Sequence, residues 1–101
     1  MKRIINGKKY DTNTASLIYR ATANCPCSDF AYWEEELFLK KTGEFFIAGE
    51  GHGFTKWASH NGNSSGYGYG LEPISLDEAK EWVSRHCTVD LYEETFGTCK
   101  E

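Results

Sequence analysis

The stretch FAYWEEELFLKKTGEFFIAGEG, residues 30–51, decides the fold class of this chain. The apolar side chains of its first half share one strand face: Trp33, Leu37 and Leu39. Glu35 falls on the same face and is the exception to the alternation. Gly43 then permits a tight turn, and an apolar segment returns along a second strand. The pattern predicts a β-hairpin over residues 31–49.

The sequence EPISLDEAKEWVSRHC, residues 72–87, predicts the main helix, near 76–87. Ser75 and Glu78 have the spacing of a capping box, in which each side chain satisfies a backbone donor at the helix start. Apolar residues follow at helical spacing: Leu76, Ala79, Trp82 and Val83. We therefore predict one α+β domain over residues 1–101, with an antiparallel sheet of about four strands and this helix on one face.

The remaining segments are less well specified. Asn6-Gly7 predicts a two-residue hairpin turn. Residues 14–23 fit a strand or a short helix, and the start of this segment slightly favours a helix or turn. The glycine-rich residues 49–70 are predicted to be mostly loop. Tyr67 and Tyr69 in that segment suit either a partner-binding loop or a cover for the sheet.

Four cysteines raise the question of a metal site: Cys25, Cys27, Cys87 and Cys99. A zinc ion takes four nitrogen or sulfur ligands, and a site of this kind would tie the C-P-C loop to the helix end and the tail. His86 is an alternative ligand to one of the cysteines. Unrelated buried thiols are the competing interpretation, and structural disulfides are disfavoured in a cytoplasmic protein.

The net charge of −4 predicts no direct nucleic-acid partner, because phosphate binding requires clustered Lys and Arg. The sequence has no apolar run of membrane-spanning length and no apolar region typical of a signal peptide. We therefore expect a cytoplasmic protein. Glu34 and Glu36 share one strand face, which is usually a solvated face. They could also form an acidic patch with other carboxylates: Asp29, Asp77, Glu78 and Glu81.

Several stretches together resemble a family of small proteins of Firmicutes and of their phages and other mobile elements: INGKKYDT (5–12), SDF (28–30), YWEEELFLKKTGEFFIAGEG (32–51), PISLDEAKEWVSRH (73–86) and YEETFG (92–97). The resemblance covers most of the chain, but it defines no active-site motif. Some phage proteins of this kind are anti-CRISPR inhibitors of type II effector nucleases. The resemblance implies such an inhibitor here, with a structural zinc as a feature of this member.

The expected function is therefore stoichiometric binding, without catalysis, to a host RNA-guided effector nuclease, which would block DNA loading or cleavage. A net-acidic inhibitor is attracted at long range to the basic channel of such an enzyme. One alternative is a non-catalytic interaction module that regulates another phage or host protein. Another is a small zinc-dependent or thiol enzyme, which would require a metal with an open coordination position or a nearby base.

The zinc hypothesis predicts about one zinc ion per purified chain, because four protein ligands complete a tetrahedral site. The double variant Cys25→Ser/Cys27→Ser is expected to lose the metal and thermal stability together, since metal binding is coupled to folding. Elemental analysis and thermal unfolding measure both effects. A double variant that keeps its zinc and its melting temperature would refute the four-cysteine site.

Overall fold

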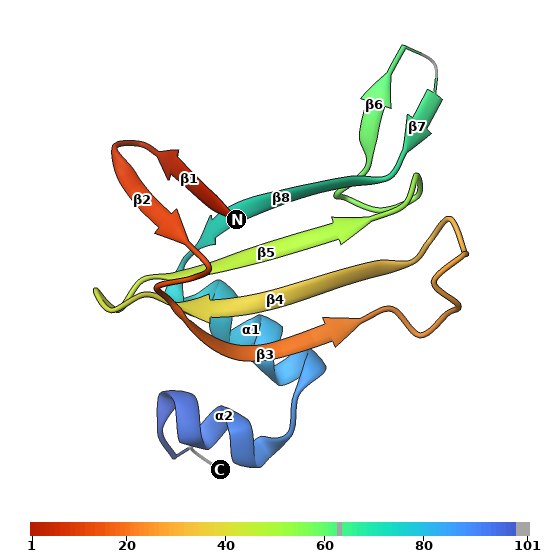
Figure 1. The fold of residues 1–101 in the computed structure, drawn as a ribbon. Coiled ribbons are helices and arrows are strands. Elements are labelled where there is room, and N and C mark those ends of the chain that lie inside the picture. Colours follow the sequence, from red (N-terminus) through yellow and green to blue (C-terminus); the bar gives the residue numbers. More distant parts are fainter. Residues whose placement is uncertain (63, 99–101) are drawn as a thin grey trace.

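The computed structural model describes residues 1–62 and 64–98 (Figure 1). Its strands are β1 (Lys2–Ile5), β2 (Lys8–Asp11), β3 (Ser16–Thr22), β4 (Trp33–Leu39), β5 (Phe45–Gly51), β6 (Ser59–Asn61), β7 (Ser64–Gly66) and β8 (Gly68–Ile74). Its helices are α1 (Leu76–His86) and α2 (Val89–Phe96). The central antiparallel sheet has the order β3-β4-β5-β8, and the other strands form two small hairpins. The predicted α+β class, with about four strands and a main helix near 76–87, is confirmed.

The predicted hairpin over 31–49 is the centre of the sheet. Strands β4 and β5 pair in continuous register from Trp33 opposite Gly51 to Leu39 opposite Phe45. Gly43 in the turn has φ +91°, a conformation that favours glycine. The alternating pattern therefore gives β4 one face toward the helices, called here the helix face, and one toward the N-terminal hairpin, called the hairpin face.

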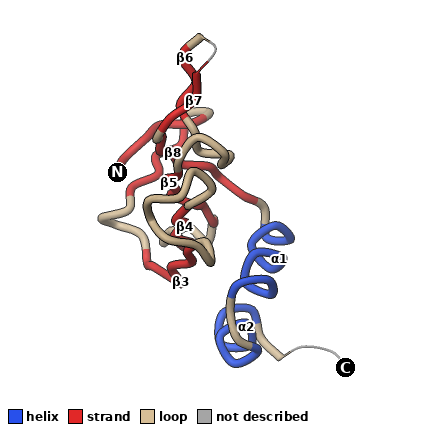
Figure 2. The backbone as a smooth tube through the Cα atoms, turned by 90° about the vertical axis from the view of Figure 1, so that its right-hand side faces the viewer, coloured by secondary structure: helices blue, strands red, loops and turns tan. Residues whose placement is uncertain are grey.

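Helix α1 begins with the predicted capping box: the Glu78 backbone N–H donates to Ser75 Oγ, and the Ser75 backbone N–H donates to the Glu78 carboxylate. Its buried residues pack on the helix face of the sheet: Ala79, Trp82 and Val83. Helix α2 extends this layer, and its Phe96 ring lies 5.6 Å from that of Phe45. Figure 2 shows both helices on one side of the strands. Neither of these described helices is long and apolar enough to cross a membrane.

Glu35 is buried on the helix face, where it accepts hydrogen bonds from two indole groups. Trp82 Nε1 of α1 donates to one carboxylate oxygen, and Trp57 Nε1 of the loop after β5 donates to the other, both at 2.8 Å. The cross-strand neighbours of Glu35 are small: Ala21, Gly49 and, one strand further, Gly70. Glu35, the exception to the apolar alternation of β4, is thus the residue at which the sheet, helix α1 and the loop after β5 meet.

The N-terminal hairpin covers part of the hairpin face. Asn6 and Gly7 both have positive φ, 51° and 77°, as the predicted turn requires. Tyr10 of β2 packs edge-on against Phe46, with ring centroids 5.5 Å apart. Phe46 in turn stacks on Phe38 at 5.2 Å. These three rings belong to an apolar cluster separate from the one under the helices, and this cluster occupies one end of the hairpin face. The β1–β2 hairpin stands over that end (Figure 1).

The structure decides one open prediction about the connecting segments and corrects another. For residues 14–23 the strand alternative holds: a turn at residues 12–14 leads into strand β3 at residues 16–22, which pairs along the edge of β4. The glycine-rich residues 49–70 contain more strand than expected. They include the end of β5, the β6–β7 hairpin and the start of β8. The glycines here bring backbone and aromatic rings close together, which composition alone does not reveal.

Gly49 and Gly70 lie opposite each other in the sheet and provide a matched test of how closely the Trp57 ring packs on the sheet. A Cβ at Gly49 would lie 2.1 Å from Trp57 Cε2, whereas one at Gly70 would meet Trp57 Cζ3 at an ordinary 3.4 Å. We expect Gly49→Ala to displace Trp57 and lower the free energy of unfolding by about 1–3 kcal/mol. Gly70→Ala should change it by less than about 1 kcal/mol. Urea unfolding followed by tryptophan fluorescence measures the free energy of unfolding of both variants. Equal effects would contradict the close packing of Trp57 against Gly49.

Candidate functional site: the acidic and aromatic end of the sheet

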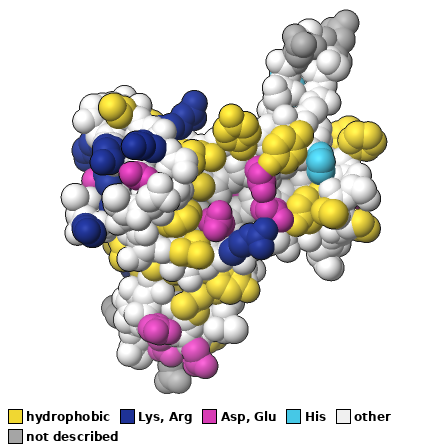
Figure 3. All heavy atoms as spheres, viewed as in Figure 1, with side chains coloured by type: hydrophobic (Ala, Val, Ile, Leu, Met, Phe, Trp, Pro, Cys, Tyr) yellow, Lys and Arg dark blue, Asp and Glu magenta, His cyan; other side chains and the backbone are white. Residues whose placement is uncertain are grey.

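The open end of the hairpin face carries a row of cross-strand neighbours: Glu34 of β4, Glu50 of β5 and Tyr69 of β8. Glu36 follows in the next row, opposite Arg20 of β3. In Figure 3, acidic side chains gather at the middle of this face, with hydrophobic side chains beside them. We call this surface, made by Glu34, Glu36, Glu50, Tyr67 and Tyr69, the acidic–aromatic face.

Glu34 is the centre of a hydrogen-bond network on this face. Tyr32 Oη donates to Glu34 Oε1 at 2.6 Å. Arg20 forms an ion pair with the same oxygen at 2.7 Å. The tyrosine hydrogen bond, a hydrogen bond from Glu50 and the Arg20 guanidinium lower the pKa of Glu34 to about 2. Glu34 is therefore ionised at neutral pH.

The pKa of Glu50 shifts in the opposite direction. Its carboxyl group hydrogen-bonds to that of Glu34, and this contact together with partial burial raises the pKa of Glu50. Tyr67 Oη also donates to Glu50, which connects the start of β8 to β5. Because two carboxylates in contact repel each other, a proton on Glu50 can be shared with Glu34. The pair is thus a place where positive charge or a proton is stabilised.

A shallow cavity of about 210 Å³ lies between these side chains. Its lining combines carboxylates with an aromatic ring: Met1, Glu34, Glu36, Ala48, Gly49, Glu50 and Tyr69. Tyr69 is 70% exposed, although a large aromatic side chain usually finds cover. Carboxylates beside an exposed aromatic ring suit a cationic side chain, which gains both an ion pair and a ring contact.

Two further exposed aromatics extend the apolar surface beyond the strand ends. Phe30 is 67% exposed and Phe54 is 79% exposed, and their rings lie 5.6 Å apart. The Phe54 backbone N–H donates to the Phe30 carbonyl at 2.9 Å, so the two loops continue the β4–β5 pairing. These rings are therefore held in place by backbone hydrogen bonds while they face solvent.

The predicted metal ligands lie in two places. Cys25 and Cys27 are in the loop between β3 and β4, and Cys87 ends α1. Burial, with a smaller contribution from Asp29, raises the pKa of the Cys25 thiol, and burial raises that of Cys87.

Within the described ranges, no three His, Cys, Asp or Glu side chains are grouped as a metal site. Cys99 lies outside the described residues, so the four-cysteine zinc site stays a prediction. The alternative ligand His86 packs against two tryptophan rings, with centroids 5.5 Å from Trp33 and 4.9 Å from Trp82. Burial there lowers the pKa of His86.

The acidic patch suggested by the sequence is divided between the two sides of the sheet. Glu34 and Glu36 lie on the hairpin face, whereas α1, which carries Asp77, Glu78 and Glu81, packs on the helix face. Sequence reasoning did not assign Glu50 to the patch. The register signal was available: a turn at Gly43 places Glu50 directly opposite Glu34.

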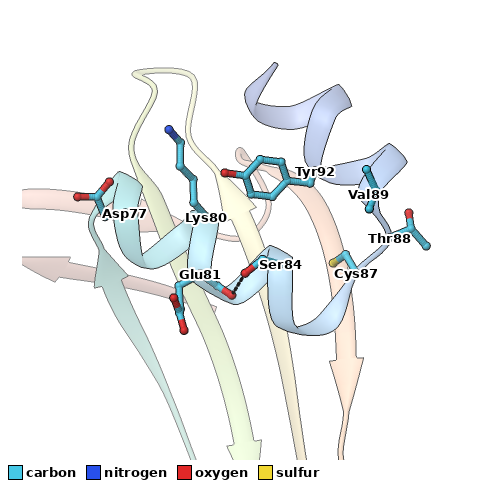
Figure 4. A pocket seen from close by; sticks show the side chains of 8 residues that line it. All are labelled: Asp77, Lys80, Glu81, Ser84, Cys87, Thr88, Val89 and Tyr92. Atoms are coloured by element: carbon cyan, nitrogen blue, oxygen red, sulfur yellow. Dashed lines mark hydrogen bonds between the residues drawn. The ribbon is translucent and has the colours of Figure 1, made fainter. Parts of the chain in front are cut away.

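A larger cavity, of about 440 Å³, lies between the two helices (Figure 4). Asp77, Lys80 and Glu81 project from α1 near one part of it, and Tyr92 faces it from α2. Cys87 lies beside the connection between the helices. The side chains of this cavity have mixed charge and do not converge on one point, so we place the candidate site on the sheet.

The comparisons with known proteins identify no relative: no family model, no curated protein and no solved structure matches this chain.

The Glu34–Glu50 pair predicts two opposite pH effects on stability. Glu34 has a lowered pKa, so its contribution is full above the ordinary value of 4.5 and is lost as the pH falls toward 2. Glu50 has a raised pKa, so its contribution is full below 4.5 and is lost as the pH rises through its folded pKa. Carboxyl ¹³C NMR should show Glu34 titrating near pH 2 and Glu50 titrating above pH 4.5.

Glu50→Gln is the matched variant for this prediction. The amide can still donate to Glu34, but the upper titration and the loss of stability with rising pH should both disappear. If both carboxyl groups of the parent chain titrated together near 4.5, the shared hydrogen bond would be contradicted.

Proposed function

We propose that the chain is a non-catalytic protein-binding module whose acidic–aromatic face docks on a basic surface of its partner. The observation that supports this proposal is the combination on one face of Glu34, Glu36 and Glu50 with the exposed Tyr69 ring. Protein interfaces are enriched in tyrosine, and their most important contacts are often aromatic residues that meet arginine. Complementary charge accelerates the encounter and selects the partner.

The partner we propose is a type II RNA-guided effector nuclease of the host. Such an enzyme holds its guide–target duplex in a positively charged channel, which is the kind of surface that the acidic–aromatic face complements. An inhibitor seated there would compete with DNA for loading or hinder cleavage. The resemblance to small phage and mobile-element proteins supports the same partner, and a cytoplasmic location in the host cell follows from it.

The test is a DNA-cleavage assay with guide-loaded type II effectors and saturating amounts of the chain. The variant Glu36→Lys/Tyr69→Ala reverses one charge and removes one exposed ring, without breaking the Glu34 network. We expect the parent chain to inhibit cleavage and the variant to bind at least about 30-fold more weakly, since an interface anchor and a charge reversal each cost about 1–3 kcal/mol.

Glu94→Lys is the control, because Glu94 is exposed on α2, outside the acidic–aromatic face. It reverses one charge while leaving the acidic–aromatic face intact, and it should inhibit like the parent chain. Unchanged cleavage with every effector tested would refute the nuclease as partner. Equal loss in both variants would refute the assigned face.

A further inference from the structure

The charges of this chain are segregated, although its net charge is negative. Six of its 11 Lys and Arg residues belong to the N-terminal hairpin and the β4–β5 turn: Lys2, Arg3, Lys8, Lys9, Lys40 and Lys41. Figure 3 shows Lys and Arg gathered at the end of the molecule that carries this hairpin, with acidic side chains among them, and further basic side chains beside the central acidic ones. We call these six residues the basic end. The net charge alone predicts no nucleic-acid partner, but a local surface can differ from the average.

The acidic residues within the basic end neutralise only part of it. Glu44 accepts from Lys8 at 3.0 Å and from Lys40 at 3.1 Å. Asp11 is buried and its carboxylate accepts a backbone hydrogen bond from Asn13. The other cations are exposed and form no ion pair with a residue that the structure describes: Lys2, Arg3, Lys9 and Lys41.

The geometry holds lysines from two separate elements together. A small cavity of about 160 Å³ lies between the hairpin and the β4–β5 turn. Three lysines line it together with two threonines and one aspartate: Lys9, Lys40, Lys41, Thr14, Thr42 and Asp11. The Lys40 ammonium group lies over the Tyr10 ring, 4.1 Å from its centroid, which fixes the turn against the hairpin. The Thr14 and Thr42 hydroxyl groups already donate, to the Asp11 carbonyl and to Glu44. The exposed ammonium groups of Lys9 and Lys41 are therefore the donors at this cavity that can contact phosphate oxygens.

From this arrangement we propose that the basic end binds the phosphate backbone of a nucleic-acid duplex. The β1–β2 hairpin is a two-stranded ribbon that stands out from the sheet (Figure 1), and a ribbon of this kind fits the major groove of DNA. Binding is independent of base sequence, because the cations meet phosphates. This inference goes beyond the proposed protein-binding function and does not depend on it, since the basic end lies outside the acidic–aromatic face.

The test is fluorescence anisotropy with a labelled DNA duplex of about 20 base pairs, long enough to offer several phosphates to the basic end. With about four phosphates contacted, the logarithm of affinity should fall with the logarithm of salt with a slope of about −3.6, or roughly 100-fold between 50 and 200 mM salt. Lys9→Gln/Lys41→Gln should reduce this slope to about −2, because two contacts are lost.

Lys80→Gln/Arg85→Gln is the control, because it removes the same charge from α1 and should bind like the parent chain. The proposal would be overturned by absence of duplex binding at 50 mM salt or by equal weakening in the two variants. Binding to a single strand of the same length, without binding to the duplex, would overturn it as well. None of these results would affect inhibition of the nuclease, so the two proposals can fail separately.

Discussion

The buried Glu35 carboxylate is the interaction on which the rest of the structure depends. A carboxylate away from water is costly unless its oxygens are hydrogen-bonded, and here each oxygen accepts an indole N–H at 2.8 Å. One indole belongs to α1 and the other to the loop after β5, so a single side chain of β4 positions both. The requirement also fixes the register of the sheet. Because side chains alternate along a strand, a Glu35 held on the helix face places Glu34 and Glu36 on the other face.

The two ends of the hairpin face differ in what covers them. At one end Tyr10 and the stacked phenylalanines form a closed apolar cluster under the N-terminal hairpin. At the other end no hairpin of the described residues covers Glu34, Glu50 and Tyr69, and the exposed Tyr69 ring lies beside the two coupled carboxyl groups. The division separates charges as well, with lysines around the covering hairpin and carboxylates on the open end. A chain with modest negative net charge therefore presents two surfaces of opposite sign, which is the basis of both proposals.

The sequence predicted the elements with strong local signals. The alternation and the Gly43 turn predicted β4 and β5, and the Ser75–Glu78 capping box predicted α1. For residues 14–23 the sequence did not decide between a strand and a short helix, because an edge strand with mixed polarity has little periodicity and acquires its structure from pairing with β4. The strands of the glycine-rich segment were missed because a high glycine content usually indicates a loop. Gly49 instead permits the close approach of the Trp57 ring to the sheet, a contact that composition does not reveal. Predicting the Glu34–Glu50 pair requires the register of two strands. Predicting the basic end requires the position of the β4–β5 turn against the N-terminal hairpin.

The acidic–aromatic face should be buried against the partner, and hydroxyl-radical footprinting of the complex is the sharpest test of this contact. Oxidation of exposed side chains would be measured with and without a guide-loaded type II effector, using Tyr69 as the reporter of the face and Val89 on α2 as the reference, since they are 70% and 68% exposed. We expect Tyr69 to become protected in the complex while Val89 reacts as it does in the free chain. Protection of Val89 with unchanged oxidation of Tyr69 would place the interface on the helices and refute the acidic–aromatic face as the contact surface.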